Sequence, residues 1–242
     1  MPDAYTVRAQ EFVCKEVTKL TSVAAELRSE GSVLVAPEVL FSHDELTAFD
    51  DALRLVPEER ISCGDTNDDH AIYVKRLMTD RAGEHPTLVN RPQSETVVSI
   101  LDDRRRRSAF AEIFQSADRF FIRRCQLHRL LPGSFVGVHL DVESNPTNEF
   151  AVIIQLGRDF EGGDFVVYPQ SKAKQVFSPT YGSVLITTCQ NRHEVTTVLS
   201  SERQSLNYFY SRDSGANARD ASEKCSRPNC AWCGPHLRMS AD

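Results

Sequence analysis

The spacing of hydrophobic positions changes near residue 123, and this change separates a helical part of the chain from a sheet part. Over residues 8–29 apolar side chains recur close to the 3.6-residue period of an amphipathic helix. A second helix is predicted from Ser42, a capping residue followed by an acidic turn, to about Val56. A third helix is predicted over Ala109 to Phe121.

Two other segments of the first half follow different patterns. The apolar run at residues 33–35 follows a glycine and predicts a short strand. Residues 58–92 mix charges, glycine and proline without a clear period, and this pattern indicates a loop or a lid.

From Arg123 onward, short runs rich in β-branched and aromatic residues alternate with turn residues, which is typical of strands. No helix pattern falls between these runs, so a parallel α/β sheet is not expected. Strands at this spacing predict an antiparallel sandwich or barrel, with a jelly roll as the natural candidate. The predicted strands cover residues 123–131, 135–142, 149–157, 164–169, 174–178, 183–188, 193–199 and 203–211.

The predicted fold is therefore α+β with a mainly β core, and the N-terminal helices pack against that core. We expect a helical region with the lid or loop segment over residues 1–122 and the sheet core over residues 123–211. Residues 212–242 form a polar, Cys-rich tail.

Composition and charge narrow the class of protein. The 242 residues are 40% hydrophobic and 26% charged, as in an ordinary globular protein. A net charge of −6 argues against a nucleic-acid partner, and the run Arg104–Arg107 is expected to be a solvated surface. The chain has neither the long apolar run of a membrane span nor a signal-peptide pattern, so we expect a cytoplasmic protein whose seven cysteines are reduced or bind metal.

Two histidines and one aspartate form the first candidate site. His139 and Asp141 lie two residues apart near a strand end, so their side chains share a face, and His193 opens a later strand. Two imidazoles and one carboxylate are the ligand set of non-haem Fe(II) oxygenases. The alternative is that His139 and Asp141 only pair at a strand end while His193 caps a loop.

Arg203 strengthens the metal-site interpretation. It begins the last predicted strand, ten residues after His193, and it shares a face with Ser205 and Asn207. A guanidinium can bind a carboxylate through two hydrogen bonds, and a neighbouring hydroxyl can add another. Such a pair suits a dicarboxylate cosubstrate that binds iron at its other end. The alternative is an exposed arginine that pairs with Glu202.

Together these residues resemble the iron(II)- and 2-oxoglutarate-dependent oxygenases, in the branch similar to prolyl hydroxylases. The matching motifs are His139-Leu140-Asp141, His193 and Arg203-Gln204-Ser205, with the hairpin segment Glu161-Gly162-Gly163 between them. The resemblance implies a double-stranded β-helix core and a requirement for Fe(II), 2-oxoglutarate and O2. It implies that His139, Asp141 and His193 bind the metal and that Arg203, supported by Ser205, binds 2-oxoglutarate.

The first core strand adds two candidate cofactor-binding residues. Gln126 and His128 alternate along it with Arg124, which makes one of its faces unusually polar. In the family that this sequence resembles, the corresponding strand lines the cavity for cosubstrate and substrate. The alternative is an edge strand whose polar face meets water. Glu149 is a weaker candidate for a substrate ammonium, and a solvated loop also explains it.

A narrower resemblance concerns the segment from Val138 through Ser144-Asn145-Pro146. It resembles the free-amino-acid hydroxylases and halogenases related to the lysine halogenases. Halogenating members carry a small residue in place of the iron-binding carboxylate, whereas this sequence has Asp141 there. The resemblance therefore implies hydroxylation.

The tail contains a possible structural zinc site made of Cys225, Cys230, Cys233 and His236. Three thiolates and one imidazole are a known zinc ligand set, but four ligands within twelve residues make a very small loop. The alternative is a set of free cysteines.

The expected function is hydroxylation of an unactivated C–H bond of a small molecule, either a free amino acid or a derivative, with formation of succinate and CO2. One alternative is a protein hydroxylase of the prolyl type. An alternative of another class is a cupin-like binding or sensor module without turnover. The oligomeric state stays open.

Overall fold

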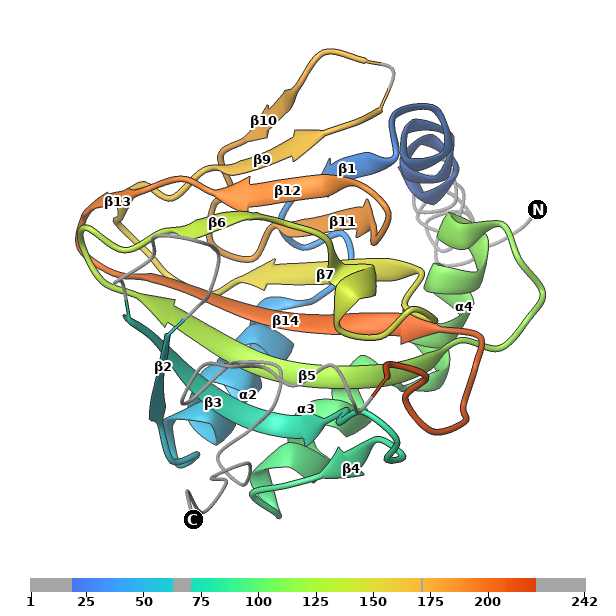
Figure 1. Ribbon diagram of the computed structural model, residues 1–242, viewed down its shortest axis with the longest axis horizontal. Helices are drawn as coiled ribbons and strands as arrows, with labels where there is room; N and C mark the ends of the chain where they lie inside the picture. The colour runs from blue at the N-terminus through green and yellow to red at the C-terminus, as the bar shows by residue number, and fades with distance from the viewer. Residues whose placement is uncertain (1–18, 63–70, 171, 221–242) are drawn as a thin grey trace, which may run out of the picture.

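The computed structural model describes residues 19–62, 71–170 and 172–220, and it contains a large and a small antiparallel β-sheet (Figure 1). The strands of the large sheet are β1 (Ser32–Val35), β2 (Glu59–Ser62), β3 (Ala71–Thr79), β4 (Thr87–Leu88), β5 (Phe121–Leu130), β7 (Phe150–Gln155), β11 (Val184–Thr188) and β14 (Arg203–Ser211). Their order is β1-β11-β7-β14-β5-β3-β2, and β4 pairs with β3 outside this path.

The small sheet contains β6 (Val136–His139), β9 (Phe165–Tyr168), β10 (Gln175–Phe177) and β12 (Arg192–Val195). Its order is β10-β9-β12-β6, so strands distant in sequence become neighbours, as in a jelly roll. Two short strands, β8 (Glu161–Gly162) and β13 (Val198–Ser200), pair with each other. The predicted jelly-roll core is thus confirmed.

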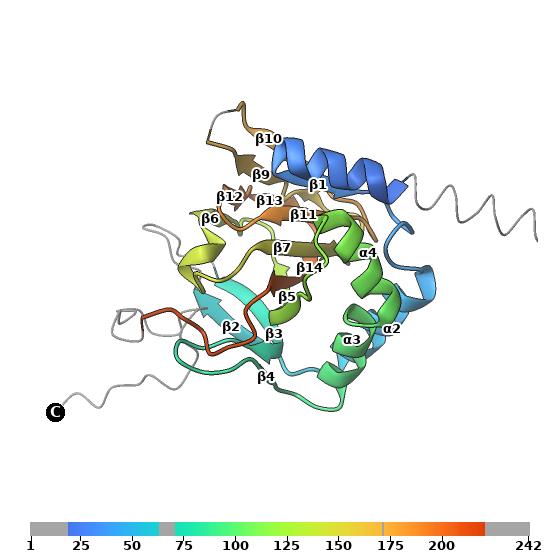
Figure 2. The ribbon, with the colours of Figure 1, turned by 90° about the vertical axis from the view of Figure 1, so that its right-hand side faces the viewer.

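Helices cover one face of the large sheet, and the small sheet lies on the other side (Figure 2). In the described part of the chain, four helices lie on that face. They are a helix over residues 19–30, α2 (His43–Arg54), α3 (Gln93–Leu101) and α4 (Arg104–Phe114). Alternation along the central strands separates two apolar clusters, because successive side chains point to opposite faces. In β7, Val152 and Ile154 pack toward the helices, whereas Ala151 and Ile153 belong to the cluster between the sheets.

The start of α2 shows how local chemistry sets an element. Ser42 Oγ accepts a hydrogen bond from Glu45 N, and Glu45 Oε2 accepts one from Ser42 N, which together form a capping box. The helix buries Leu46, Phe49 and Leu53 on one face. This helix was predicted from Ser42, and the prediction is confirmed.

The prediction of a loop or lid over residues 58–92 is wrong for much of its length. That segment supplies β2, β3 and β4, and β3 pairs with β5 in the large sheet. The strand pattern was hidden because Lys75 and Arg76 lie within β3 beside the buried Val74 and Leu77. The N-terminal region therefore contributes strands to the main sheet as well as helices.

The predicted third helix begins and ends earlier than expected. Asp103 caps α4 by accepting a hydrogen bond from Arg106 N, and Gln115 ends it with a φ of 50°. Helix α3 was missed, because it begins after Pro92 without a side-chain cap.

The run Arg104–Arg107 is not uniformly solvated, which corrects the expectation of a surface patch. Arg106 is buried, with 1% of its side chain exposed, and it forms an ion pair with Glu45. Its guanidinium also lies 4.4 Å from the centre of the Phe41 ring. Burial is tolerated here because the carboxylate and the ring face compensate the lost hydration.

The tail is described only to residue 220, and the possible zinc ligands Cys225, Cys230, Cys233 and His236 lie outside the described residues. Cys125 and Cys189 are buried free thiols. None of the helices in the described ranges is long and apolar enough to cross a membrane.

Candidate active site between the two sheets

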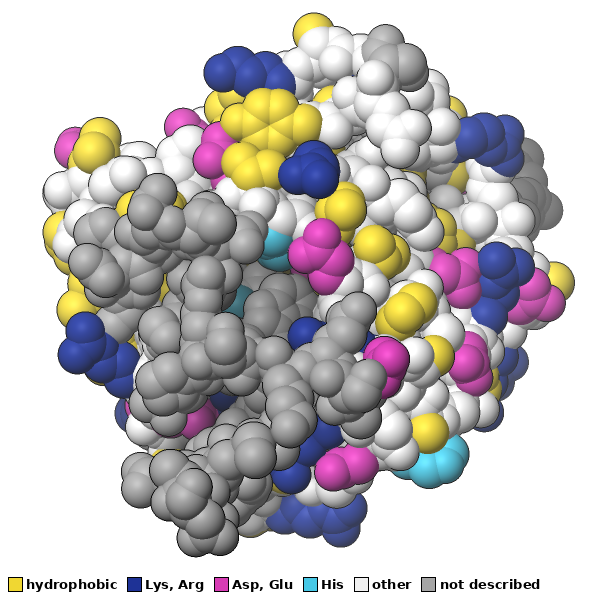
Figure 3. Space-filling model, in the orientation of Figure 1, with side chains coloured by type: hydrophobic (Ala, Val, Ile, Leu, Met, Phe, Trp, Pro, Cys, Tyr) yellow, Lys and Arg dark blue, Asp and Glu magenta, His cyan; other side chains and the backbone are white. Residues whose placement is uncertain are grey.

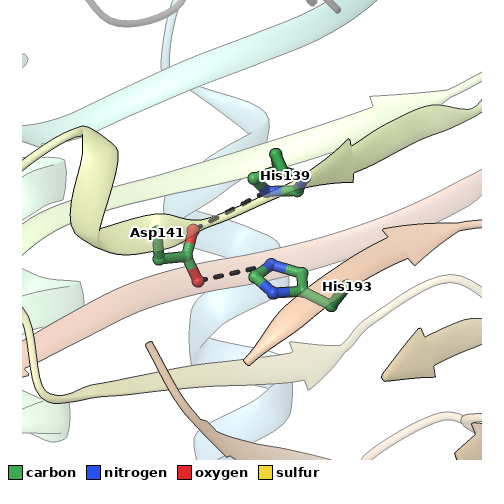
Figure 4. A group of neighbouring side chains, drawn as sticks. All are labelled: His139, Asp141 and His193. Atoms are coloured by element: carbon green, nitrogen blue, oxygen red, sulfur yellow. Dashed lines mark ion pairs between the residues drawn. The ribbon is translucent and has the colours of Figure 1, made fainter. Parts of the chain in front are cut away.

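His139 and His193 lie directly opposite each other on the paired strands β6 and β12. Because directly opposed residues of an antiparallel pair project from the same face, the two imidazoles point the same way, and their ring centres are 4.3 Å apart. Asp141 follows β6 at the start of a 3-10 turn, Asp141–Glu143, and its carboxylate faces both rings, with one oxygen directed to each (Figure 4). The structure therefore brings the three predicted residues together.

The ligand atoms of this cluster converge on one point. Asp141 Oδ2 lies 3.3 Å from His193 Nε2, and Asp141 Oδ1 lies 3.7 Å from His139 Nε2. One ligand atom from each residue falls within 4.8 Å of the other two. Figure 3 shows histidine side chains near the middle of the face that is drawn there, among interspersed acidic and basic groups.

Backbone contacts fix the orientation of both rings. His139 Nδ1 lies 2.9 Å from Gly137 O, and His193 Nδ1 lies 2.9 Å from Asn191 O. Since a carbonyl only accepts, each Nδ1 donates, and in the neutral form of each ring Nε2 is left with a lone pair for a metal. The Phe165 ring stacks on His193 at 5.0 Å between ring centres and restricts its rotation further. Sequence reasoning missed Phe165, which reaches His193 only through the pairing of β9 with β12.

Electrostatics keep the cluster suited to a cation. Burial alone would raise the pKa of Asp141, but the nearby imidazoles of His193 and His139 outweigh burial and lower it. Burial lowers the pKa of His193 despite the Asp141 charge. At neutral pH the site thus offers one carboxylate and at least one neutral imidazole.

Arg203 lies in the same cavity, at the start of β14, and it is almost completely buried. Its Nη1 donates to Ser205 Oγ at 3.2 Å, whereas Nε and Nη2 make no hydrogen bond to any described residue. Burial lowers the pKa of Arg203 to about 10, against the opposing charge of Asp164. Since an uncompensated buried charge is costly, these free donors are suited to an anionic ligand.

Gly163 makes room for this arginine. It has a φ of +65°, and a Cβ on residue 163 would lie 2.7 Å from Arg203 Cδ. The segment Glu161-Gly162-Gly163 was recognised in the sequence as part of a family motif, and the structure gives a physical reason for its second glycine.

Gln126 and His128 point into the cavity from β5, beside Asn207 and Ser205 of the paired strand β14. Gln126 Nε2 lies 2.5 Å from His128 Nε2. Burial, reinforced by the charges of Arg124 and Arg203, lowers the pKa of His128 to about 3, so its ring is neutral at physiological pH. The polar face of this strand therefore lines the cavity, and β5 is not an edge strand because it lies between β14 and β3.

Arg124 continues the same face and places a second cation in the cavity. Its guanidinium lies 4.6 Å from the centre of the Phe209 ring, next to the metal-binding cluster. Glu149, in contrast, bonds Arg212 through its carboxylate at 2.8 Å, so the structure does not place it as a partner for a substrate ammonium.

Comparisons with known proteins decide the family. The profile of the 2OG-Fe(II) oxygenase superfamily matches residues 125–211. A crystal structure of an oxidoreductase of the 2OG-Fe(II) oxygenase family from Burkholderia pseudomallei is 51% identical, with a TM-score of 0.82 over 83% of this chain and 94% of that chain. The chain belongs to the 2OG-Fe(II) oxygenase family. It is accordingly an oxidoreductase that depends on Fe(II) and 2-oxoglutarate.

More distant structures share the fold of this oxygenase. A Pseudomonas putida prolyl-4-hydroxylase is 18% identical with a TM-score of 0.57, over 80% of this chain and 99% of that chain. The non-haem α-ketoglutarate-dependent epimerase SnoN from nogalamycin biosynthesis is 14% identical with a TM-score of 0.63, over 90% of this chain and 95% of that chain. No curated protein matches the sequence.

The residues in the cavity fit the two groups that the family requires. Nε2 of each histidine and the Asp141 carboxylate form the donor set for Fe(II), and the unpartnered donors of Arg203 suit one carboxylate of 2-oxoglutarate. Both groups of residues line a single cavity.

Proposed function

We propose that this oxygenase hydroxylates an unactivated C–H bond of a small molecule with a carboxylate, of the free amino acid class. The observation that carries the proposal is the intact carboxylate of Asp141 facing two oriented imidazoles, in one cavity with Arg203, whose Nε and Nη2 have no hydrogen-bond partner among the described residues. With Fe(II) and 2-oxoglutarate bound, O2 would be the oxidant: 2-oxoglutarate and the substrate C–H bond each supply two electrons, one oxygen atom of O2 enters the substrate, the other enters succinate, and CO2 is released.

Different residues of the cavity bind the metal, bind 2-oxoglutarate and line the space around the substrate. His139, Asp141 and His193 hold the metal, and Arg203 with Ser205 holds the far carboxylate of 2-oxoglutarate. Gln126 and the neutral His128 contribute uncharged hydrogen-bonding groups next to Ser205 and Asn207. Apolar side chains of the cavity, including Phe165, exclude water around the reacting groups.

Arg124 supports a substrate that carries a carboxylate. It lines the cavity beside Asp141, and the Phe209 ring below it holds the guanidinium in place. A substrate carboxylate that pairs with Arg124 would sit near the metal with its carbon chain directed into the cavity. An arginine pairs well with a carboxylate because its donors match both oxygen atoms.

The experiment is a coupled assay of the full-length protein with Fe(II) and 2-oxoglutarate over free amino acids, proline-containing peptides and nucleosides. We expect one or a few amino acids to drive succinate formation and to gain one oxygen atom, as measured by mass spectrometry. The variant His193→Ala serves as the control for background oxidation. Turnover of a peptide without turnover of any free amino acid would replace this proposal with a prolyl-type protein hydroxylase.

A further inference from the structure

The loop that carries Asp141 is closed by its own hydrogen bonds. Ser144 donates to Asp141 O through both N, at 3.1 Å, and Oγ, at 2.7 Å. Asn148 N donates to Asn145 O at 3.0 Å, and Asn148 Nδ2 reaches Ser144 Oγ at 3.3 Å. These bonds fix the shape of the loop, but they do not determine where the loop lies relative to β12 and His193.

A buried ion pair on the neighbouring strands ties this loop to the large sheet. Arg123 of β5 bonds Asp80, at the end of β3, with Nη2 to Oδ1 at 2.9 Å and Nε to Oδ2 at 3.3 Å. The exposed fractions of the two side chains are 0% and 3%. Asp80 Oδ2 also accepts a hydrogen bond from Asn145 Nδ2 at 2.8 Å, so the loop is bonded directly to the ion pair.

The segment that follows β14, residues 212–219, which we call the strap, completes this network. Arg123 Nη1 donates to Asp213 O at 3.0 Å and to Gly215 O at 2.8 Å. Asn217, 3% exposed, donates through Nδ2 both to Asp80 O at 3.0 Å and to Ser144 O at 3.1 Å. One amide thus joins the strap, the end of β3 and the Asp141 loop.

We propose that Asp80, Arg123 and Asn217 are positioning residues that set the metal affinity of the site by fixing the loop that carries Asp141. A buried ion pair is maintained only where further hydrogen bonds compensate its desolvation, and here those bonds lead to the loop and the strap. The histidines are fixed by paired strands, whereas Asp141 lies beyond the end of β6 and depends on these contacts. Asp80, Arg123 and Asn217 all lie outside residues 125–211, the part that the family profile matches.

This inference rests on the proposed metal site, so the test measures metal binding without turnover. Full-length protein is stripped of metal and titrated with Mn(II), and free Mn(II) is followed by electron paramagnetic resonance. Two variants leave the ion pair between Asp80 and Arg123 intact. Asn217→Ala removes the hydrogen bonds of this amide to Asp80 O and Ser144 O. Asn145→Ser keeps a hydroxyl that can accept the local hydrogen bond from Thr147 N, but this hydroxyl is too short to reach Asp80. Loss of a group that bonds a metal ligand directly weakens metal binding by about 10–100-fold; because Asn217 and Asn145 act through the loop and not on the Asp141 carboxylate itself, we expect the lower end of this range, about tenfold.

The matched control is Ser32→Ala, which removes a buried hydrogen bond to Thr187 Oγ1 at 2.7 Å on β1, far along the large sheet from β3. Thermal unfolding of each variant shows whether its loss of stability is comparable. We expect Ser32→Ala to bind Mn(II) like the wild type. The proposal is overturned if both Asn variants bind Mn(II) within about twofold of the wild type, or if Ser32→Ala weakens binding equally. If the wild type shows no Mn(II) binding that His193→Ala abolishes, the proposed metal site itself is wrong.

Discussion

Gly163 and Arg203 lie so close together that a single added carbon on residue 163 would overlap the arginine. The Cβ would be 2.7 Å from Arg203 Cδ, and φ at Gly163 is +65°. We expect Gly163→Ala to displace the guanidinium and to weaken 2-oxoglutarate binding by about tenfold, because a charge-assisted pair depends on bidentate geometry. Isothermal titration with 2-oxoglutarate measures the effect.

The control for this prediction is Gly133→Ala. Gly133 also has a positive φ, +87°, but no atom lies within 4 Å of the added Cβ. It therefore reproduces the backbone strain without the clash. Equal losses of 2-oxoglutarate affinity in the two variants would show that strain alone, and not the contact with Arg203, is responsible.

Removal of the arginine itself should have a larger effect. Loss of one partner of a buried charged pair costs about 2–5 kcal/mol, so Arg203→Ala should weaken 2-oxoglutarate binding by about 30-fold or more. Arg129→Ala is the control, because Arg129 lies on the paired strand β5 and bonds Glu58 and Glu202 instead of lining the cavity. An unchanged affinity in Arg203→Ala would remove this residue from the site.

The metal ligands can be tested by measuring the bound iron, the turnover and the fold of the same variant. His193→Ala should lose bound iron and turnover while its circular dichroism spectrum stays that of the wild type, since the ring contributes a ligand at a strand that many other contacts hold. His85→Ala, at an exposed position, should keep both. Full iron content in His193→Ala would contradict the assignment.

Asp141 should determine the product. With its carboxylate on the metal, the wild type should add oxygen to its substrate even in high chloride, as product mass analysis would show. Asp141→Gly should lose hydroxylation by more than about tenfold, because a ligand is removed from the metal. A chlorinated main product from the wild type would show that Asp141 does not bind the iron.

His128 should make stability depend on pH. In the folded protein burial lowers its pKa to about 3, whereas in the unfolded chain it titrates near 6.5. Between these values the unfolded state binds the extra proton, so the free energy of unfolding falls as the pH decreases through this window. Urea unfolding of metal-free protein at pH 7 and pH 5 should show a smaller decrease for His128→Gln, and His85→Gln should behave like the wild type.

Sequence patterns predicted the sheet core well because alternation is a local signal. The strands β7, β11 and β14 fall within the predicted ranges, β5 begins two residues before its predicted start at Arg123, and the short β8 was missed. The prediction over 193–199 corresponds to two strands, β12 and β13. Strand β3 was not predicted because Lys75 and Arg76 interrupt the pattern of apolar residues, although β3 pairs with β5 at these positions.

The site was predictable only where short motifs mark it. His139, Asp141, His193 and Arg203 are brought into one cavity, as their spacing suggested. The buried pair between Asp80 and Arg123 joins residues 43 positions apart, and the contact of Asn217 with Ser144 spans 73. No local pattern signals such contacts, because they exist only after the sheets have formed. The same holds for Arg106, whose burial depends on Glu45 from another helix.

The strap also bears on the order in which the protein is completed during synthesis. His139 and Asp141 are made before Asn217 and the carbonyls that Arg123 binds, which belong to the last part of the described chain. Because the chain is made from its N-terminal end, all three metal ligands are synthesised before the residues that secure their loop. The metal centre of this oxygenase therefore reaches its final form only when residues well beyond its last ligand have been made and bound.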